Sequence, residues 1–220
     1  MPLLGQAAMT SWHDLESGRE TDHDHWHSHQ HLAERVGIAG FLRGRRYRVV
    51  SGEPEYFLMY EVDDLAVLTS EAYQTRLNNP TEWSQRIIPS LRDMNRTLSR
   101  VLGSRGQGVS AYALTVRFTA EDQGREALIA SLVGNLIPQW CSKPGVTAAH
   151  LLEGDAQASG VPTRESRLRG GGDNFADLVL IVEGYDRGVL QSLDTRVAAP
   201  ADQQLRALYQ LSHVVAKADL

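Results

Sequence analysis

The stretch LMYEVDDLAVLTS, residues 58–70, decides the fold because it recurs as LIVEGYDRGVLQS at residues 180–192. Six of the thirteen aligned positions are identical, including the pairs Glu61/Glu183 and Asp64/Asp186. Each copy is an apolar run, then an acidic or turn-forming boundary, then a helical pattern, which is typical of a strand that leads into a helix. The repeat predicts a tandem duplication in which each half supplies part of one sheet system.

The composition favours a globular, cytoplasmic protein. A chain of 220 residues can hold two domains of about 110 residues, and 42% hydrophobic content lets each bury a core. A net charge of −5 disfavours a protein that neutralises nucleic-acid phosphates. No apolar run approaches the roughly 20 residues of a membrane span. The single cysteine, Cys141, excludes an internal disulfide and fits a reducing compartment.

Hydrophobic periodicity and turn residues predict the order β-α-β-β-α-β in each half. The strands of the first half are expected at residues 3–12, 41–50, 56–62 and 97–102, with helices at 21–36 and 65–77. The strands of the second half are expected at residues 111–118, 146–153, 176–182 and 204–215, with helices at 127–137 and 189–197. A glycine-rich linker at residues 103–108 separates the two predicted domains, residues 1–103 and 109–220. Each half would form a four-stranded sheet with both helices on one face, and the two bare faces would pack together.

The first helix carries a histidine at every second position from residue 23 to residue 31. At about 100° per residue, its side chains divide into two faces. The predicted packing face contains Trp26, His29, Leu32, Ala33 and Val36. The opposite, polar stripe contains His23, His27, His31 and Arg35.

Three interpretations compete for this stripe. It is a solvated helix face, or His27 and His31 bind a divalent transition metal, or one histidine is a general acid–base group. The metal interpretation lacks a third ligand at a diagnostic spacing. An imidazole titrates near neutral pH, and Arg35, Arg45 or Arg46 could hold an anionic oxygen of the substrate.

Three runs carry a resemblance to a known family: WHSHQHLAERVGIAGFLRGRRYRVV at 26–50, PEYFLMYEV at 54–62 and NNPTEW at 78–83. They resemble the EthD-like branch of the dimeric α/β-barrel superfamily. The matching positions are Trp26, His31, Gly40, Phe41, Arg45, Arg46 and Tyr47. The resemblance implies an α+β protein in which two ferredoxin-like repeats pack sheet to sheet as an intramolecular dimeric α/β barrel, with a pocket between sheet and helices. Such relatives include cofactor-free oxygenases, cyclases, isomerases and haem enzymes, so the resemblance implies no single reaction.

The second half lacks the polar helix face. When Gly40 is aligned with Gly145, Leu136 falls opposite His31 and Ser131 falls opposite Trp26. We therefore expect one site per chain, built mainly from the first half. The predicted catalytic residues are His31, which also matches the family position, Arg46 and Tyr47. The predicted substrate-binding residues are Trp26, Arg35, Arg45, Tyr60 and Trp83.

These residues favour an enzyme that acts on an aromatic or carbonyl-containing small molecule by general acid–base chemistry, as a lyase, isomerase or cofactor-free oxygenase. One alternative is a non-catalytic small-molecule-binding or accessory protein, and another is a metal-dependent enzyme that uses His27 and His31. We expect either no cofactor or a divalent transition metal, in preference to haem. Neither nucleic acid nor membrane is an expected partner, and a homodimer remains an alternative to a monomer.

Overall fold

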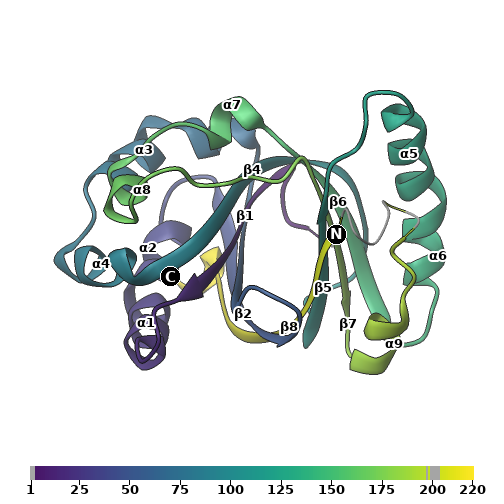
Figure 1. Ribbon diagram of the computed structural model, residues 1–220, viewed down its shortest axis with the longest axis horizontal. Helices are drawn as coiled ribbons and strands as arrows, with labels where there is room; N and C mark the ends of the chain where they lie inside the picture. The colour runs from purple at the N-terminus through teal and green to yellow at the C-terminus, as the bar shows by residue number, and fades with distance from the viewer. Residues whose placement is uncertain (1–2, 197, 199–203) are drawn as a thin grey trace.

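The computed structural model describes residues 3–196, 198 and 204–220, and these residues form a closed antiparallel barrel of eight strands (Figure 1). The strands are β1 (Ala7–Leu15), β2 (Phe41–Ser51), β3 (Tyr56–Val62), β4 (Leu91–Gly106), β5 (Tyr112–Phe118), β6 (Val146–Gly154), β7 (Leu178–Gly184) and β8 (Gln204–Ala216). Around the barrel they follow the order β1-β3-β2-β8-β5-β7-β6-β4. The protein is therefore a mixed α+β protein, as expected.

Helical segments lie outside the barrel. In the first half they are α1 (Glu20–Trp26), the π-helical η1 (His27–His31), α2 (Leu32–Val36), the 3₁₀ segment η2 (Leu65–Thr69), α3 (Glu71–Asn78), α4 (Glu82–Ile87) and η3 (Ile88–Ser90). In the second half they are α5 (Arg125–Ser131), the π-helical η4 (Leu132–Leu136), α6 (Ile137–Cys141), α7 (Ala156–Ser159), α8 (Arg164–Leu168), α9 (Arg187–Ser192) and η6 (Lys217–Asp219). No helix among the described residues is both long enough and apolar enough to cross a membrane.

The two halves join through their outer strands. The first half runs β4-β1-β3-β2 and the second runs β8-β5-β7-β6, and the pairs β2–β8 and β4–β6 connect them. The halves therefore form one closed barrel instead of two stacked sheets, because each outer strand finds a partner across the boundary. The predicted linker is wrong at residues 103–106, which continue β4 and pair with β6.

Helical and strand segments recur at constant spacing. The pairs β1/β5, α1/α5, η1/η4 and α2/α6 each begin 105 positions apart (residues 7 and 112, 20 and 125, 27 and 132, 32 and 137). The pair β3/β7 begins 122 positions apart, at residues 56 and 178. The spacing grows because residues 155–177 connect β6 to β7, whereas residues 52–55 connect β2 to β3. The longer connection contains α7 and α8, which lie over the helices of the first half (Figure 1).

The barrel interior is filled by large side chains and by an ion cluster. Trp12 stacks on Phe57 with ring centroids 5.0 Å apart, and Tyr47 also stacks on Phe57, with ring centroids 5.2 Å apart. Arg45 is fully buried and bonds Glu183 at 2.8 Å and Glu61 at 3.0 Å. Buried charges need such partners because water cannot solvate them. The repeated glutamates therefore hold the two halves together through one arginine.

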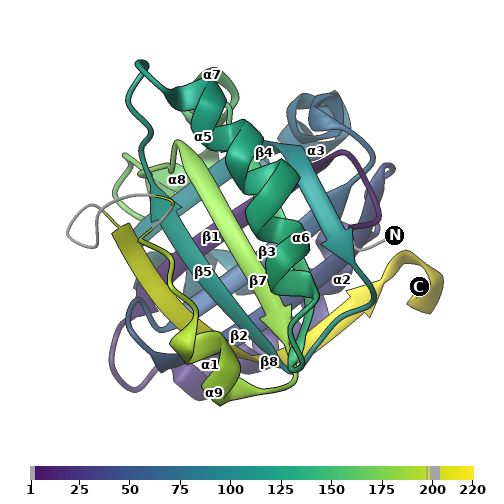
Figure 2. The same cartoon turned by 90° about the vertical axis from the view of Figure 1, so that its right-hand side faces the viewer.

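The helix layer of the second half packs tightly on its sheet. Figure 2 shows α5 and α6 across the outer face of this half of the barrel. Leu132, Ile137 and Trp140 pack with Leu151 and Leu180 in one apolar cluster. Apolar side chains thus occupy the layer that holds histidines in the first half.

Candidate functional site

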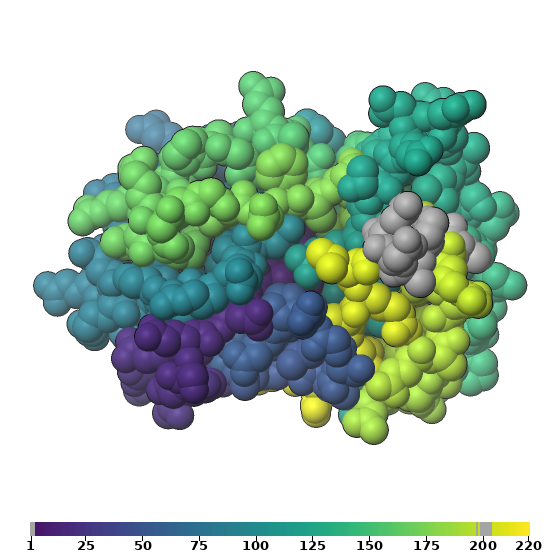
Figure 3. Space-filling view, viewed as in Figure 1, coloured from purple at the N-terminus to yellow at the C-terminus, as the bar shows by residue number. Residues whose placement is uncertain are grey.

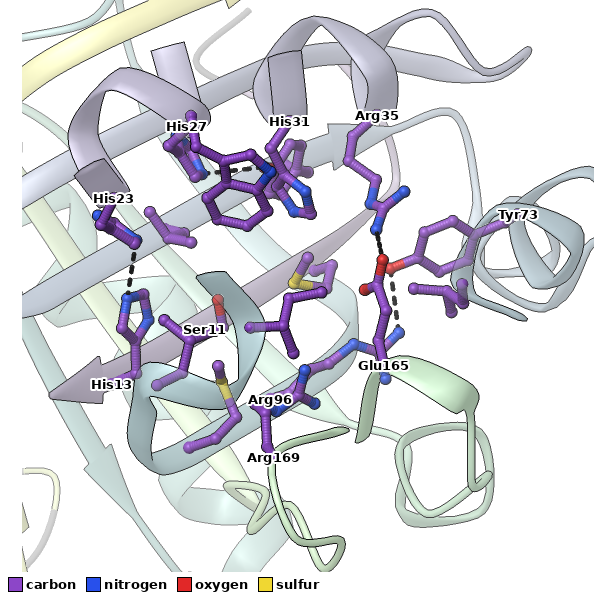
Figure 4. A pocket seen from close by; sticks show the side chains of 18 residues that line it. Ser11, His13, His23, His27, His31, Arg35, Tyr73, Arg96, Glu165 and Arg169 are labelled. Carbon is purple, nitrogen blue, oxygen red and sulfur yellow. Dashed lines mark hydrogen bonds and ion pairs between the residues drawn. The ribbon is translucent and has the colours of Figure 1, made fainter. Parts of the chain in front are cut away.

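A small cavity of about 50 Å³ lies in the first half, between the helix α1-η1-α2 and the outer face of β1 and β3 (Figure 4). Its floor comes from Met9, Ser11 and His13 on β1, which share a face because side chains alternate along a strand. Leu58 and Tyr60 of β3 extend this floor. The site therefore lies outside the barrel.

The roof of the cavity is the histidine stripe. His23, His27, His31 and Arg35 all line it, with exposed fractions of 0%, 0%, 9% and 1%. The solvated-face interpretation is therefore wrong for these four residues. The π segment η1 lies in the middle of the stripe, and such widened turns are frequent at functional sites. His29 was predicted on the packing face but is exposed, because the helix turns the opposite stripe, with His23, His27 and His31, toward the sheet.

Hydrogen bonds order three side chains at one end of the cavity. His23 Nδ1 lies 3.1 Å from Asp24 Oδ1, and the Nε2 atoms of His23 and His13 are 3.3 Å apart. Because an ionised carboxylate only accepts, it holds the proton on His23 Nδ1, so His23 Nε2 accepts a hydrogen bond from the N–H of His13 Nε2. His13 Nδ1 is then a bare lone pair. It is buried and has no hydrogen-bond partner among the residues that the structure describes.

Burial keeps these imidazoles neutral. Loss of water, reinforced by neighbouring positive charges, holds the pKa values of His13, His27 and His31 well below the usual 6.5. For His31, the nearby charge that contributes most is Arg35. Burial opposes the shift of Asp24, but the hydrogen bond from His23 still lowers the pKa of this carboxyl. At neutral pH the cavity therefore contains neutral histidines that can accept a proton.

The other end of the cavity is cationic. Arg35 on α2, Arg96 on β4 and Arg169 after α8 all line it. Arg35 Nη2 forms a buried ion pair with Glu165 of α8, and Arg96 Nη2 donates to the Tyr73 hydroxyl at 3.0 Å. Burial opposes ionisation of Arg35, yet the Glu165 carboxylate raises its pKa. This end is suited to an anionic oxygen.

Solved structures with the same architecture span the whole chain. An anthrone oxidase-like protein superposes with a TM-score of 0.64 and 13% identity over 98% of this chain and 95% of that chain. This is the dimeric α/β-barrel fold. A candidate monooxygenase from Fusobacterium nucleatum subsp. nucleatum superposes with a TM-score of 0.61 and 12% identity, over 98% of this chain and 96% of that chain. Another candidate monooxygenase, from Lactobacillus acidophilus NCFM, superposes with a TM-score of 0.60 and 6% identity, over 96% of this chain and 97% of that chain.

At these identities the likeness to solved structures shows the dimeric α/β-barrel, ferredoxin-like fold alone. No protein-family model matches the sequence, and no curated protein matches it either.

The dimeric α/β barrel brings five of the predicted site residues together. Trp26, His27, His31, Arg35 and Tyr60 all line the cavity. The Tyr60 hydroxyl lies 3.3 Å from His27 Nε2, and Trp26 donates through Nε1 to Ser84 at 3.2 Å. The ring centroids of Trp26 and His31 are 4.2 Å apart. The structure thus has a pocket between the sheet and the first helix, at the place where the sequence predicted one.

The other predicted site residues lie elsewhere. Arg45 and Tyr47 point into the barrel, where Arg45 Nη1 donates to the Tyr47 hydroxyl at 2.9 Å. Arg46 lies on the outer face, but it donates to the Asp24 carbonyl at 2.9 Å and to Ser212 at 3.2 Å, which ties α1 to β2 and β8. Trp83 packs against His25 with ring centroids 5.2 Å apart, outside the cavity. Their predicted grouping with His31 is wrong, because strand alternation and the helix direct them away from it.

Sequence reasoning missed several lining residues. For His13 a signal existed. Met9, Ser11 and His13 occupy every second position of β1 and therefore share one face, and two of the three are polar. Tyr73 and Arg96 had no distinguishing pattern. Glu165 and Arg169 belong to a segment distant in sequence, and only its path over the first half brings them here.

The metal hypothesis for His27 and His31 stays a prediction. The two rings are 5.5 Å apart between centroids. Within the described ranges, no three His, Cys, Asp or Glu side chains are grouped so that they could hold a metal ion.

Proposed function

We propose that this protein is an oxygenase-type enzyme that needs no cofactor and deprotonates a small aromatic or carbonyl compound in the histidine pocket. The observation that carries the proposal is His31: a buried, neutral imidazole that lines the cavity beside the guanidinium of Arg35. A base of this kind removes a proton, and the cation stabilises the anion that forms. The fold shared with an anthrone oxidase-like protein and candidate monooxygenases adds support.

The chemistry balances with dioxygen as the only co-reactant. A substrate with an activated CH₂ group loses a proton to His31 and becomes a carbanion. The carbanion gives one electron to O₂, and the resulting radicals combine through a new C–O bond into a peroxide anion. The second C–H proton passes to the outer peroxide oxygen as the O–O bond breaks, which gives a carbonyl group and hydroxide, and the proton held by His31 then converts the hydroxide to water. Overall, CH₂ and O₂ become C=O and H₂O.

The surroundings of His31 suit this sequence of steps. Met9, Leu58 and Leu91 are apolar walls that exclude water, which strengthens the electrostatic effect of Arg35 on an anion. Tyr60 holds His27 through its hydroxyl, so that the second imidazole is fixed in place. A lyase or isomerase would use the same first proton transfer, and dioxygen consumption separates these alternatives.

The test uses anthrone in air-saturated buffer, with oxygen uptake followed by electrode and quinone formation by absorbance. His31→Ala should lower turnover about a hundredfold or more while the far-ultraviolet circular dichroism stays unchanged. His29→Ala, an exposed position on the same helix, is the matched control and should keep full activity. Absence of oxygen uptake by the wild type with anthrone and with related activated methylene compounds would overturn the proposal. Equal rates for His31→Ala and wild type would remove His31 from the mechanism.

We also propose that the chain arose by duplication of one ferredoxin-like module of the EthD-like branch. The constant spacing of β1/β5, α1/α5, η1/η4 and α2/α6 supports the duplication. The recurring cap supports it as well, since Asp64 accepts from the Val67 amide and Asp186 accepts from the Val189 amide. In this view only the first copy kept polar residues on its helix, and the second copy supplies the segment that covers them.

A further inference from the structure

The segment that covers the pocket is fixed at both ends to β4. At its start, the Asp155 amide donates to the Leu98 carbonyl at 2.7 Å, and the Leu98 amide donates to Ser159 Oγ at 3.0 Å. At its end, the Arg96 amide donates to the Asn174 carbonyl at 2.8 Å, and the Asn174 amide donates back to Met94 at 3.0 Å. In the space-filling view this segment lies directly against the surface of the first half (Figure 3). Residues 160–173 therefore span the pocket between two anchors.

Between the anchors, α8 is a preformed unit with few attachments. In a capping box, the side chains of Thr163 and Ser166 each accept a hydrogen bond from the backbone amide of the other residue, which satisfies these amides at the first turn of α8. The Arg164 amide donates to Asn78 Oδ1 at 3.0 Å, at an exposed position. The buried attachments of α8 are the ion pair between Glu165 and Arg35 (Figure 4) and the partly buried Leu168, which packs against the apolar cluster of Trp26, Ile87 and Ile88. Gly170, Gly171 and Gly172 follow α8 with positive φ angles and with open space around them, so the chain can turn there without a clash.

Arg35 has bonding capacity left toward the cavity. Its Nη1 atom is buried and has no hydrogen-bond partner within the described part of the chain, and a carboxylate oxygen of Glu34 lies 4.0 Å away. Arg35, Arg96 and Arg169 line the cavity, and Glu165 is the only carboxylate among the described lining residues. Asp173, outside the lining, pairs with Arg169 at 2.5 Å, so Arg35 and Arg96 supply the charge that an anion meets. The carboxylate of α8 thus occupies a site that is built for an anion.

The size of the cavity shows that part of its lining must move for a ring to enter. The open volume is about 50 Å³, whereas an engineered protein cavity that binds benzene measures about 150 Å³. The rigid walls are the barrel strands and the α1-η1-α2 helix, so the mobile candidate is the segment with the fewest buried attachments.

We infer that Arg35 is the subsite for an anionic oxygen on the substrate, and that Glu165 fills this subsite until the substrate displaces it together with α8. The substrate class is therefore an apolar aromatic ring that carries a carboxylate or an ionised phenol. This inference deepens the proposed function, since it names the substrate class of the same pocket. It assigns Glu165 as a specificity residue that competes with ligand, and it requires no chemistry at Glu165.

The test compares 2-naphthoate with 2-naphthamide, which has the same ring and no charge, by titration calorimetry under nitrogen. Wild type should bind 2-naphthoate more tightly than 2-naphthamide. Glu165→Gln should strengthen 2-naphthoate binding about tenfold, equivalent to about 1.4 kcal/mol, and should strengthen 2-naphthamide binding less, because the neutral ring gains only the easier movement of α8 and not the freed Arg35. The double variant Arg35→Gln/Glu165→Gln removes both charges at once and therefore leaves no unpaired buried ion; it should lose the preference for 2-naphthoate. A parallel titration with 2-naphthol against its methyl ether shows whether ionised phenols share the subsite.

Amide hydrogen exchange reports the motion directly. Saturating 2-naphthoate should increase exchange in residues 163–169 of wild type, because the ligand releases α8 from Arg35. Equal affinity for the charged and neutral naphthalenes, weaker 2-naphthoate binding by Glu165→Gln, or unchanged exchange in α8 would each overturn the inference. These measurements need no turnover. If 2-naphthoate behaves as expected but anthrone consumes no oxygen, the proposed function fails and the anion subsite stands.

Discussion

His13 and His23 share a hydrogen bond between their Nε2 atoms, which lie 3.3 Å apart at one end of the pocket. One residue belongs to β1 and the other to α1, and Asp24 holds the far side of the His23 ring. Because two identical nitrogens cannot both donate, this contact sets the tautomer of each ring. Through the two imidazoles, the partly exposed carboxylate of Asp24 is connected to the buried, unprotonated Nδ1 atom of His13 at the cavity.

The first prediction concerns these tautomers. At pH 7, nitrogen-15 spectra should show His23 protonated at Nδ1 and His13 protonated at Nε2, because Asp24 accepts only. Asp24→Asn should mix the two forms of His23, since an amide side chain can donate as well as accept. The exposed His29 is the internal control, and its spectrum should not change. Finding His13 protonated at Nδ1 in the wild type would contradict the assignment.

The second prediction concerns stability against pH. His13, His27 and His31 have lowered pKa values in the folded protein because of burial, so between those values and about 6.5 the unfolded chain binds more protons. As far as these three histidines determine it, the free energy of unfolding should therefore reach its full value above about pH 6.5. It should fall as the pH drops toward the folded pKa values, by up to about 1.4 kcal/mol per pH unit for each histidine.

Urea unfolding at several pH values between 5 and 8 measures this dependence. His27→Gln should make the free energy of unfolding depend less steeply on pH, whereas His29→Gln, at an exposed position, should leave the slope unchanged. A free energy of unfolding that stays constant from pH 7 to pH 5 would show that these imidazoles are not held neutral by the fold.

The third prediction concerns the pH dependence of turnover. In the proposed reaction His31 is the base, and its lowered pKa keeps it neutral through the neutral range, so kcat/KM for anthrone should stay level as the pH falls from 8 to about 6.5. It should decline only at lower pH, where the imidazole gains a proton. A half-maximal rate at or above pH 6.5 would point to a solvated histidine or to another base.

The fourth prediction concerns the ion cluster inside the barrel. Arg45→Met should destabilise the fold by about 3–5 kcal/mol, because Glu61 and Glu183 would lose their shared buried cation. Thermal unfolding measures the change. Arg196→Met, which breaks the exposed pair with Asp194, is the control and should leave the midpoint unchanged. A mild effect of Arg45→Met would mean that water reaches the two glutamates.

Local patterns in the sequence determined a large part of this protein. Strand alternation placed Arg45 and Tyr47 on one face of β2 and Arg46 on the other, and the helical repeat placed His23, His27, His31 and Arg35 on one stripe. The repeat at residues 58–70 and 180–192 marked β3 and β7. These features could be predicted because backbone geometry forces periods of about two and 3.6 residues on neighbouring side chains.

Tertiary structure alone decided what each face meets. The face of β2 that carries Arg45 turned out to point into the barrel, because β2 pairs with β8 and β4 with β6 to close it. The stripe became the roof of a pocket because β1 brought His13 beneath it and α8 brought Glu165 across it. Such contacts join residues far apart in the chain, and no local period encodes them, so they depend on how the whole surface is buried.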